Sequence, residues 1–155
     1  MLGCATAATA QVEGKSKVDY VGFDQLTSEV YEYRNTRLVG VDTFNLYSRE
    51  AGTIILDTRS KAAYDEIHIK GAIHLNFSDF TTKKLADVIP SKETRILIYC
   101  NNNVQSDLNS MRDKAAPLAL NIPTFINLYG YGYMNIYELK DYLSEFDDRI
   151  EFVRK

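Results

Sequence analysis

The sequence predicts an α/β protein in which a parallel sheet carries helices on both faces. Short runs rich in β-branched apolar residues alternate with segments of helical spacing, the pattern of strands buried between two layers of helices. The clearest run is residues 95–99 (RILIY), which predicts a central strand. No internal repeat or low-complexity linker divides the 155 residues, so one domain is expected.

The expected helices and strands follow one another along the chain. Helices are expected over residues 23–34, 42–52, 61–67, 78–89, 107–118 and 135–143, and strands over residues 53–57, 72–75, 95–99 and 124–128. Asp24 is a candidate N-cap for the first helix. Gly52 suits a left-handed end of the second helix, and Pro90 closes the fourth.

Composition and charge exclude several classes of protein. The formal charge is -3, from 18 basic and 21 acidic residues, which argues against general nucleic-acid binding because phosphate neutralisation needs a basic surface. Two cysteines rule out a disulfide scaffold and a four-cysteine zinc site. No apolar run reaches the 18 or more residues of a membrane span.

The first ten residues (MLGCATAATA) are small, apolar and uncharged, and a polar segment follows them abruptly. Ala8-Thr9-Ala10 has the small-x-small form read by signal peptidases, so residues 1–14 are expected to be a signal-peptide remnant of an exported, periplasmic protein. Leu2-Gly3-Cys4 resembles a lipoprotein signal, in which Cys4 would carry a lipid anchor. The alternative is a disordered terminus on a cytoplasmic protein.

Cys100 is the candidate nucleophile, because it follows the central strand directly and ligands of open parallel sheets bind beyond the carboxyl ends of the strands. The amides of the following loop and the start of the next helix are expected to surround the sulfur and to lower its pKa. The residues of that active-site loop are Asn101, Asn102, Asn103, Val104, Gln105 and Ser106.

Four segments together resemble the rhodanese-like, or sulfurtransferase, domain family. They are ILDTR at 55–59, YxxxHIKGAIHL at 64–75, ILIYC at 96–100 and LYGYG at 128–132. The resemblance implies a three-layer sandwich around a five-stranded parallel sheet in residues 15–155, with a helical extension over about 20–52. It also implies that Cys100 cycles through a persulfide, without a cofactor.

The loop departs from the family pattern, because it carries amides where active sulfurtransferases usually carry a basic residue. Losing a charge-assisted contact costs about 1.5–3 kcal/mol, so weak turnover with thiosulfate is expected and a neutral or larger persulfide donor is favoured. The enlarged segment around Asp107 to Asp113 lets Arg112 fold back toward the sulfur and replace the charge. Ser106 stands where a Cys-x5-Arg phosphatase has arginine, which disfavours phosphatase activity.

The remaining candidates have structural alternatives. The resemblance implies that Asp57 and Arg59 brace the rim of the site, and that His68 and His74 pack loops rather than form a dyad with Cys100. No Cys and His cluster offers four ligands, so no metal is expected. The candidate rim tyrosines either wall an acceptor pocket, dock a partner or pack in the core; they are Tyr129, Tyr131 and Tyr133.

The sequence therefore favours a sulfurtransferase that moves sulfane sulfur from a thiosulfate- or persulfide-type donor to a thiol or cyanide through Cys100. The partners expected are a small-molecule or protein donor and a thiol acceptor, and no nucleic acid. The alternative is a catalytically weak rhodanese-like module that binds a partner protein. A thiol redox protein would need Cys4 as its resolving cysteine.

Overall fold

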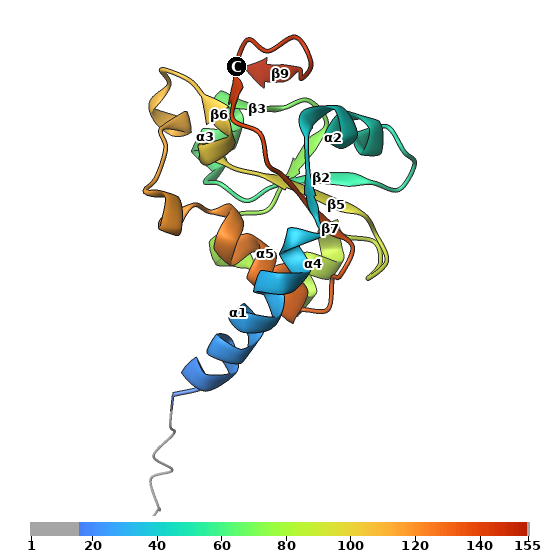
Figure 1. The fold of residues 1–155 in the computed structure, drawn as a ribbon, viewed down its shortest axis with the longest axis vertical. Coiled ribbons are helices and arrows are strands. Elements are labelled where there is room, and N and C mark those ends of the chain that lie inside the picture. Colours follow the sequence, from blue (N-terminus) through green and yellow to red (C-terminus); the bar gives the residue numbers. More distant parts are fainter. Residues whose placement is uncertain (1–15, 155) are drawn as a thin grey trace, which may run out of the picture.

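The computed structural model describes residues 16–154, and a five-stranded parallel sheet forms its centre (Figure 1). The strands are β1 (Leu38–Val39), β2 (Ile54–Asp57), β4 (Ala72–His74), β5 (Ile96–Tyr99) and β7 (Ile136–Leu139). Their order across the sheet is β1-β7-β5-β2-β4, and every neighbouring pair is parallel. The sequence prediction of a parallel α/β sandwich is confirmed, and β5 lies at its centre.

Helices cover both faces of this sheet because successive strand residues point to opposite sides. Ile96 and Ile98 of β5 join the core under α1 (Tyr20–Asn35), α4 (Thr82–Val88) and α5 (Asn121–Gly130). Leu97 and Tyr99 join the core under α2 (Val41–Ser48) and α3 (Lys61–Glu66). Figure 1 shows these two groups of helices on opposite sides of the strands.

Short elements complete the described chain. Two small pairings flank the main sheet, namely β3 (Ile67–Ile69) with β9 (Phe152–Arg154), antiparallel, and β6 (Val104–Gln105) with β8 (Leu143–Ser144), parallel. Four 3-10 turns are present at η1 (Phe77–Asp79), η2 (Asn101–Asn103), η3 (Asn109–Met111) and η4 (Ala116–Leu118). No helix within residues 16–154 is both long and apolar enough to cross a membrane.

The helix α1 packs on the core from Leu26 onward, while its start projects into solvent. Leu26, Val30 and Tyr33 pack into the core, whereas Tyr20 near its start is 83% exposed. Gly130 at the end of α5 permits this close approach, because a Cβ there would lie 2.8 Å from Leu26 Cδ2. Most of the helical extension expected over about 20–52 is present as α1, β1 and α2, while the expected signal remnant lies outside the described residues.

The elements after Cys100 differ from the sequence prediction. The strand expected over 124–128 is part of α5, and the helix expected over 135–143 contains β7. Periodicity does not separate a short buried helix from a buried strand, and Pro123 in the first turn of α5 was the overlooked start signal. The helix expected to end at Leu118 is wrong as well, because η3 and η4 occupy that stretch.

Several boundaries closer to the N-terminus also move. The cap of α1 is Asp19, whose side chain accepts from Gly22 N, rather than Asp24. The helix α2 ends at Ser48, and Gly52 takes its positive φ of 80° in the turn that follows. The strands expected over 53–57, 72–75 and 95–99 are confirmed as β2, β4 and β5.

Candidate functional site

Cys100 lies at the carboxyl end of the central strand β5, where the sequence places the nucleophile. The chain turns there into η2, with Cys100 as its N-cap. The residue is 1% exposed, so its sulfur is enclosed by protein.

Backbone amides approach the sulfur from two segments. The N–H groups of Asn102 in η2, and of Leu120 and Asn121 at the start of α5, all favour the thiolate. The N-terminus of α5 therefore supplies the partial positive charge that the sequence prediction assigned to a helix directly after the loop. Convergence of amides on the sulfur is thus present, although most of it comes from residues twenty positions downstream.

Burial outweighs these amides. Removal of water from around the sulfur is the largest influence, and it raises the pKa of Cys100 above its ordinary value. The prediction of a lowered pKa is therefore wrong. Its physical reason is the enclosure of the sulfur, which costs the thiolate more than three amide contacts return.

The three asparagines after Cys100 hold backbone segments. Asn101 Nδ2 donates to Arg112 O at 3.0 Å, and Asn102 Nδ2 donates to Lys114 O at 2.6 Å. Lys114 N returns a bond to Asn102 Oδ1 at 3.2 Å, so this pair resembles a short ladder. These amides fasten the segment 110–114 beside the site instead of presenting free donors to a substrate.

The other residues of the predicted active-site loop, 104–106, also make structural contacts. Val104 and Gln105 pair with β8, and Ser106 Oγ donates to Glu145 Oε2 at 2.8 Å. Arg112 is exposed, and its Nε donates to Asn109 Oδ1 at 2.8 Å. The expectation that Arg112 turns toward the sulfur is therefore wrong, because its guanidinium binds a neighbour in the same segment.

A network of polar side chains connects Cys100 to α1, and the sequence prediction did not include it. Asn103 Oδ1 accepts from Cys100 N at 3.0 Å and from Asn121 Nδ2 at 2.9 Å. Asn121 Nδ2 also lies 3.3 Å from Glu138 Oε1. Glu138 is bound by Arg34, whose Nε and Nη2 donate at 2.5 and 2.6 Å. The only signal in the sequence was a charged residue inside the apolar strand β7.

A cavity of about 290 Å³ opens beside this network of polar side chains, and its volume is at the low end for ligand pockets. Its wall combines apolar side chains with two cations and one carboxylate. The residues that line it are Arg34, Leu38, Asn102, Asn103, Ala116, Ala119, Asn121, Ile122, Glu138, Leu139 and Lys140. Asn102 and Asn121, whose backbone N–H groups act on the sulfur, both line this cavity, whereas Cys100 itself does not.

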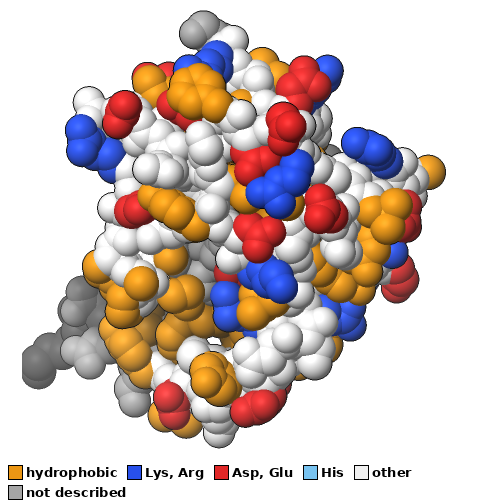
Figure 2. All heavy atoms as spheres, turned by 45° about the horizontal axis from the view of Figure 1, so that its top comes forward, with side chains coloured by type: hydrophobic (Ala, Val, Ile, Leu, Met, Phe, Trp, Pro, Cys, Tyr) orange, Lys and Arg blue, Asp and Glu red, His pale blue; other side chains and the backbone are white. Residues whose placement is uncertain are grey.

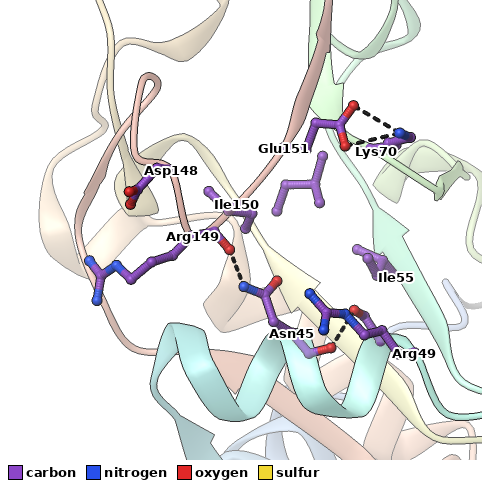
Figure 3. A pocket seen from close by; sticks show the side chains of 10 residues that line it. Asn45, Arg49, Ile55, Lys70, Asp148, Arg149, Ile150 and Glu151 are labelled. Atoms are coloured by element: carbon purple, nitrogen blue, oxygen red, sulfur yellow. Dashed lines mark hydrogen bonds and ion pairs between the residues drawn. The ribbon is translucent and has the colours of Figure 1, made fainter.

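Another cavity, of about 300 Å³, lies between α2 and the segment 148–151 (Figure 3). Its ionic lining includes the pair Lys70 and Glu151, joined at 2.8 Å, and the side chains of Arg49 and Arg149. The lining contains no cysteine or histidine, and its one hydroxyl side chain is that of Ser48. Figure 2 shows acidic and basic side chains intermixed over one face of the molecule, without a broad field of one sign.

Asp57 and Arg59 form a buried support under the site. Arg59 Nη2 lies 2.6 Å from Asp57 Oδ2 and donates to Ile67 O at 2.5 Å. Tyr99 donates its hydroxyl to the same Asp57 oxygen at 2.5 Å, and burial raises the pKa of Tyr99 well above its ordinary value. These contacts join β2, β3 and β5, which fits the bracing role that the resemblance to the rhodanese-like family implied.

The two histidines make local contacts. His74 Nε2 lies 2.8 Å from Arg59 O, and His68 Nδ1 lies 2.7 Å from Tyr64 O. The ring of His68 stacks on that of Tyr64, with centroids 3.9 Å apart. His68 in β3 thus contacts the backbone of α3, and His74 in β4 contacts the backbone of the loop after β2, as expected of packing residues.

The tyrosines near the C-terminal end of α5 lie away from Cys100. The N-terminus of α5 meets the sulfur, and Tyr129 and Tyr131 come after most of its ten residues, at the edge where β7 begins. Tyr129 packs on Tyr33, and Tyr131 donates to Phe80 O at 3.2 Å, while Tyr133 is 2% exposed. The expectation that they wall a pocket at the cysteine is wrong, because the helix separates the two ends.

Several solved structures are similar to this chain at low sequence identity. The chain is similar to the BH2092 protein from Bacillus halodurans, with 19% identity, coverage of 75% of this chain and 74% of that one, and a TM-score of 0.49. For the rhodanese-like domain of the Alr3790 protein from Anabaena sp, the values are 20%, 67%, 67% and 0.47. A thiosulfate sulfurtransferase from Pseudomonas aeruginosa is 18% identical, with coverage of 78% of this chain and 20% of that chain and a TM-score of 0.49. No curated protein matches.

The family model named rhodanese-like domain matches residues 42–147, which is more than half of the chain. The match contains Cys100, the Asp57 and Arg59 support and the N-terminus of α5. It begins after α1, so Arg34 lies outside it. On this match, the chain belongs to the rhodanese-like domain family.

Proposed function

We propose that the protein is a sulfurtransferase in which Cys100 accepts a sulfane sulfur and passes it to a thiol or to cyanide. The Cys100 thiolate attacks the outer sulfur of the donor, the donor S–S bond breaks, and the donor leaves as sulfite or a thiolate. An acceptor then attacks the persulfide sulfur, and Cys100 departs as thiolate. A sulfur atom is transferred in each of the two steps, and neither step needs an external oxidant or reductant.

The observation that carries the proposal is the convergence of three backbone N–H groups on the Cys100 sulfur. Such groups stabilise an anion without a metal, and a persulfide on Cys100 would remain an anion between the two steps. The amides of Asn102, Leu120 and Asn121 come from two different segments, so this arrangement of N–H groups exists only when the start of α5 packs beside η2.

The enclosure of the sulfur adds a condition to the reaction. At 1% exposure the thiol meets a donor only after part of its cover moves, and the segment 110–114 fastened by Asn101 and Asn102 is the part of the cover we assign to that movement. Turnover is therefore expected to be slow. Persulfide donors are expected to work better than thiosulfate, since residues 101–106 carry no basic side chain.

The same enclosure favours a second candidate function, a non-catalytic rhodanese-like module. A cysteine that is 1% exposed and holds its proton tightly resembles a structural thiol more than a nucleophile. The two candidates differ in one respect, which is whether Cys100 forms and then loses a persulfide.

Intact-mass spectrometry separates them. The protein is incubated with glutathione persulfide, and in parallel with thiosulfate, and is examined for the addition of one sulfur atom. Cys4→Ser should keep the adduct and Cys100→Ser should lose it, and a later addition of cyanide or a thiol should remove the sulfur with formation of thiocyanate or a new persulfide. Absence of an adduct with either donor would reject sulfur transfer and leave the binding module.

A further inference from the structure

The helix α1 contributes a charge to the Cys100 site although it lies outside the residues that match the family model. Arg34, in the last turn of α1, makes a two-pronged contact with Glu138 in β7. Such a bidentate contact fixes both side chains more firmly than a single bond. The carboxylate is 5% exposed, so it depends on Arg34 for compensation of its charge.

The position of Glu138 matters for Cys100. Asn121 contacts both, because its backbone N–H acts on the sulfur and its Nδ2 lies 3.3 Å from Glu138 Oε1. A negative charge at that place opposes the formation of a second one on sulfur, and Glu138 accordingly raises the pKa of Cys100. In an enclosed site this repulsion is weakly screened by solvent.

The charges around this pair decide how much of that repulsion remains. Lys140 follows β7 and lines the same cavity as Arg34 and Glu138, giving two cations for one carboxylate. Beside Tyr99, the charges of Asp57 and Arg59 are paired with each other at 2.6 Å. Arg34 is thus the cation in direct contact with the carboxylate that acts on the sulfur.

We propose that Arg34 is a positioning residue of the Cys100 site, which neutralises Glu138 and so allows a thiolate to form next to a buried carboxylate. The proposal rests on the proposed function for its purpose, since sulfur transfer needs the thiolate. Arg34 in α1 takes over the electrostatic task that residues 101–106 cannot perform without a basic side chain.

Charge reversal in a double-mutant cycle tests the proposal. All variants carry Cys4→Ser, and the ionisation of Cys100 is followed by thiolate absorbance, as the difference from a Cys100→Ser protein, and by the pH dependence of iodoacetamide alkylation. Arg34→Gln should raise the thiol pKa and Glu138→Gln should lower it, each by roughly one pH unit. The double variant should return close to the parent value, and Arg34→Lys should also remain near it.

A matched control is Arg95→Gln, which removes another arginine paired with a glutamate, at the N-terminal end of β5 and so at the opposite end of that strand from Cys100. Its thiol pKa should equal that of the parent. Far-UV circular dichroism and thermal melting establish that each variant is folded, and Arg34→Lys and Glu138→Gln are the mildest changes of the set. Shifts in the same direction for Arg34→Gln and Glu138→Gln, or no shift in either, would overturn the proposal.

The readout is independent of sulfur transfer. If the predicted pattern appears and no donor yields a persulfide, the proposed function fails and the role of Arg34 stands. If a persulfide forms and the pattern is absent, Arg34 only anchors α1 and the proposed function stands.

Discussion

Replacing Asn102 by alanine should open the route to Cys100 without touching the thiol. The change removes the side-chain bond from Nδ2 to Lys114 O at 2.6 Å and the bond from Lys114 N to Oδ1 at 3.2 Å. It keeps the backbone N–H of residue 102 that acts on the sulfur. The segment 110–114 then stays attached mainly through Asn101.

The magnitude follows from the two bonds. Each intramolecular hydrogen bond contributes about 0.5–1.5 kcal/mol net, and the pair is partly exposed, so the closed segment should lose about 1–2 kcal/mol. Such a loss raises the open fraction by a factor of about 5–30. If opening of this segment limits access, alkylation of Cys100 by iodoacetamide should accelerate by the same factor.

The assay is intact-mass kinetics in a Cys4→Ser background at fixed pH, with hydrogen exchange of residues 110–116 measured in parallel. Asn135→Ala is a matched control. Asn135 precedes β7, at the N-terminal ends of the strands, and donates one side-chain hydrogen bond to Glu93 O at 3.0 Å. Faster exchange of the segment with an unchanged alkylation rate would refute the reasoning, since the cover over the sulfur would then lie elsewhere.

Three further predictions concern the buried support and the pH range of the fold. Arg59→Met should lower stability by about 3–5 kcal/mol in urea titrations, because it leaves the carboxylate of Asp57 buried without its cation; a loss below 1 kcal/mol would contradict this. Tyr99→Phe should cost about 1–3 kcal/mol, since Asp57 loses a donor at 2.5 Å and Ile69 N an acceptor at 3.0 Å. Burial raises the pKa of both Tyr99 and Cys100, so the folded state holds their protons more tightly than the unfolded state. Their contribution to stability is complete below their ordinary pKa values and is lost as pH rises through the raised ones, so the melting temperature should fall above about pH 9 and fall less steeply in Cys100→Ala.

The sequence predicted best where a strand is buried and ends in a chemically distinctive residue. The run 95–99 followed by Cys100 predicted the central strand correctly, and Cys100 lies at the carboxyl end of that strand, while its role as a nucleophile stays a prediction. The segment after it was predicted poorly, since residues 124–128 and 136–139 are short and mostly apolar, and over so few residues periodicity does not separate a helix from a strand.

Contacts over long sequence distances account for the remaining differences. The pairing of Arg34 with Glu138 joins residues 104 positions apart, and the approach of Asn121 to the sulfur joins residues on two different elements. Neither has a local pattern in the chain. The raised pKa of Cys100 is likewise a property of burial in the folded chain, which no local sequence pattern records.

A single amide, that of Asn103, serves as the junction of three parts of the molecule. Its oxygen accepts from Cys100 N and Asn121 Nδ2, and its nitrogen donates to Leu139 O at 2.8 Å and to Asp141 O at 3.2 Å. An aspartate would retain the two acceptor contacts and face two carbonyl oxygens with a negative charge. Cys100, the tip of α5 and the end of β7 are therefore linked through one side chain, so a ligand that displaces any one of them should also shift the other two.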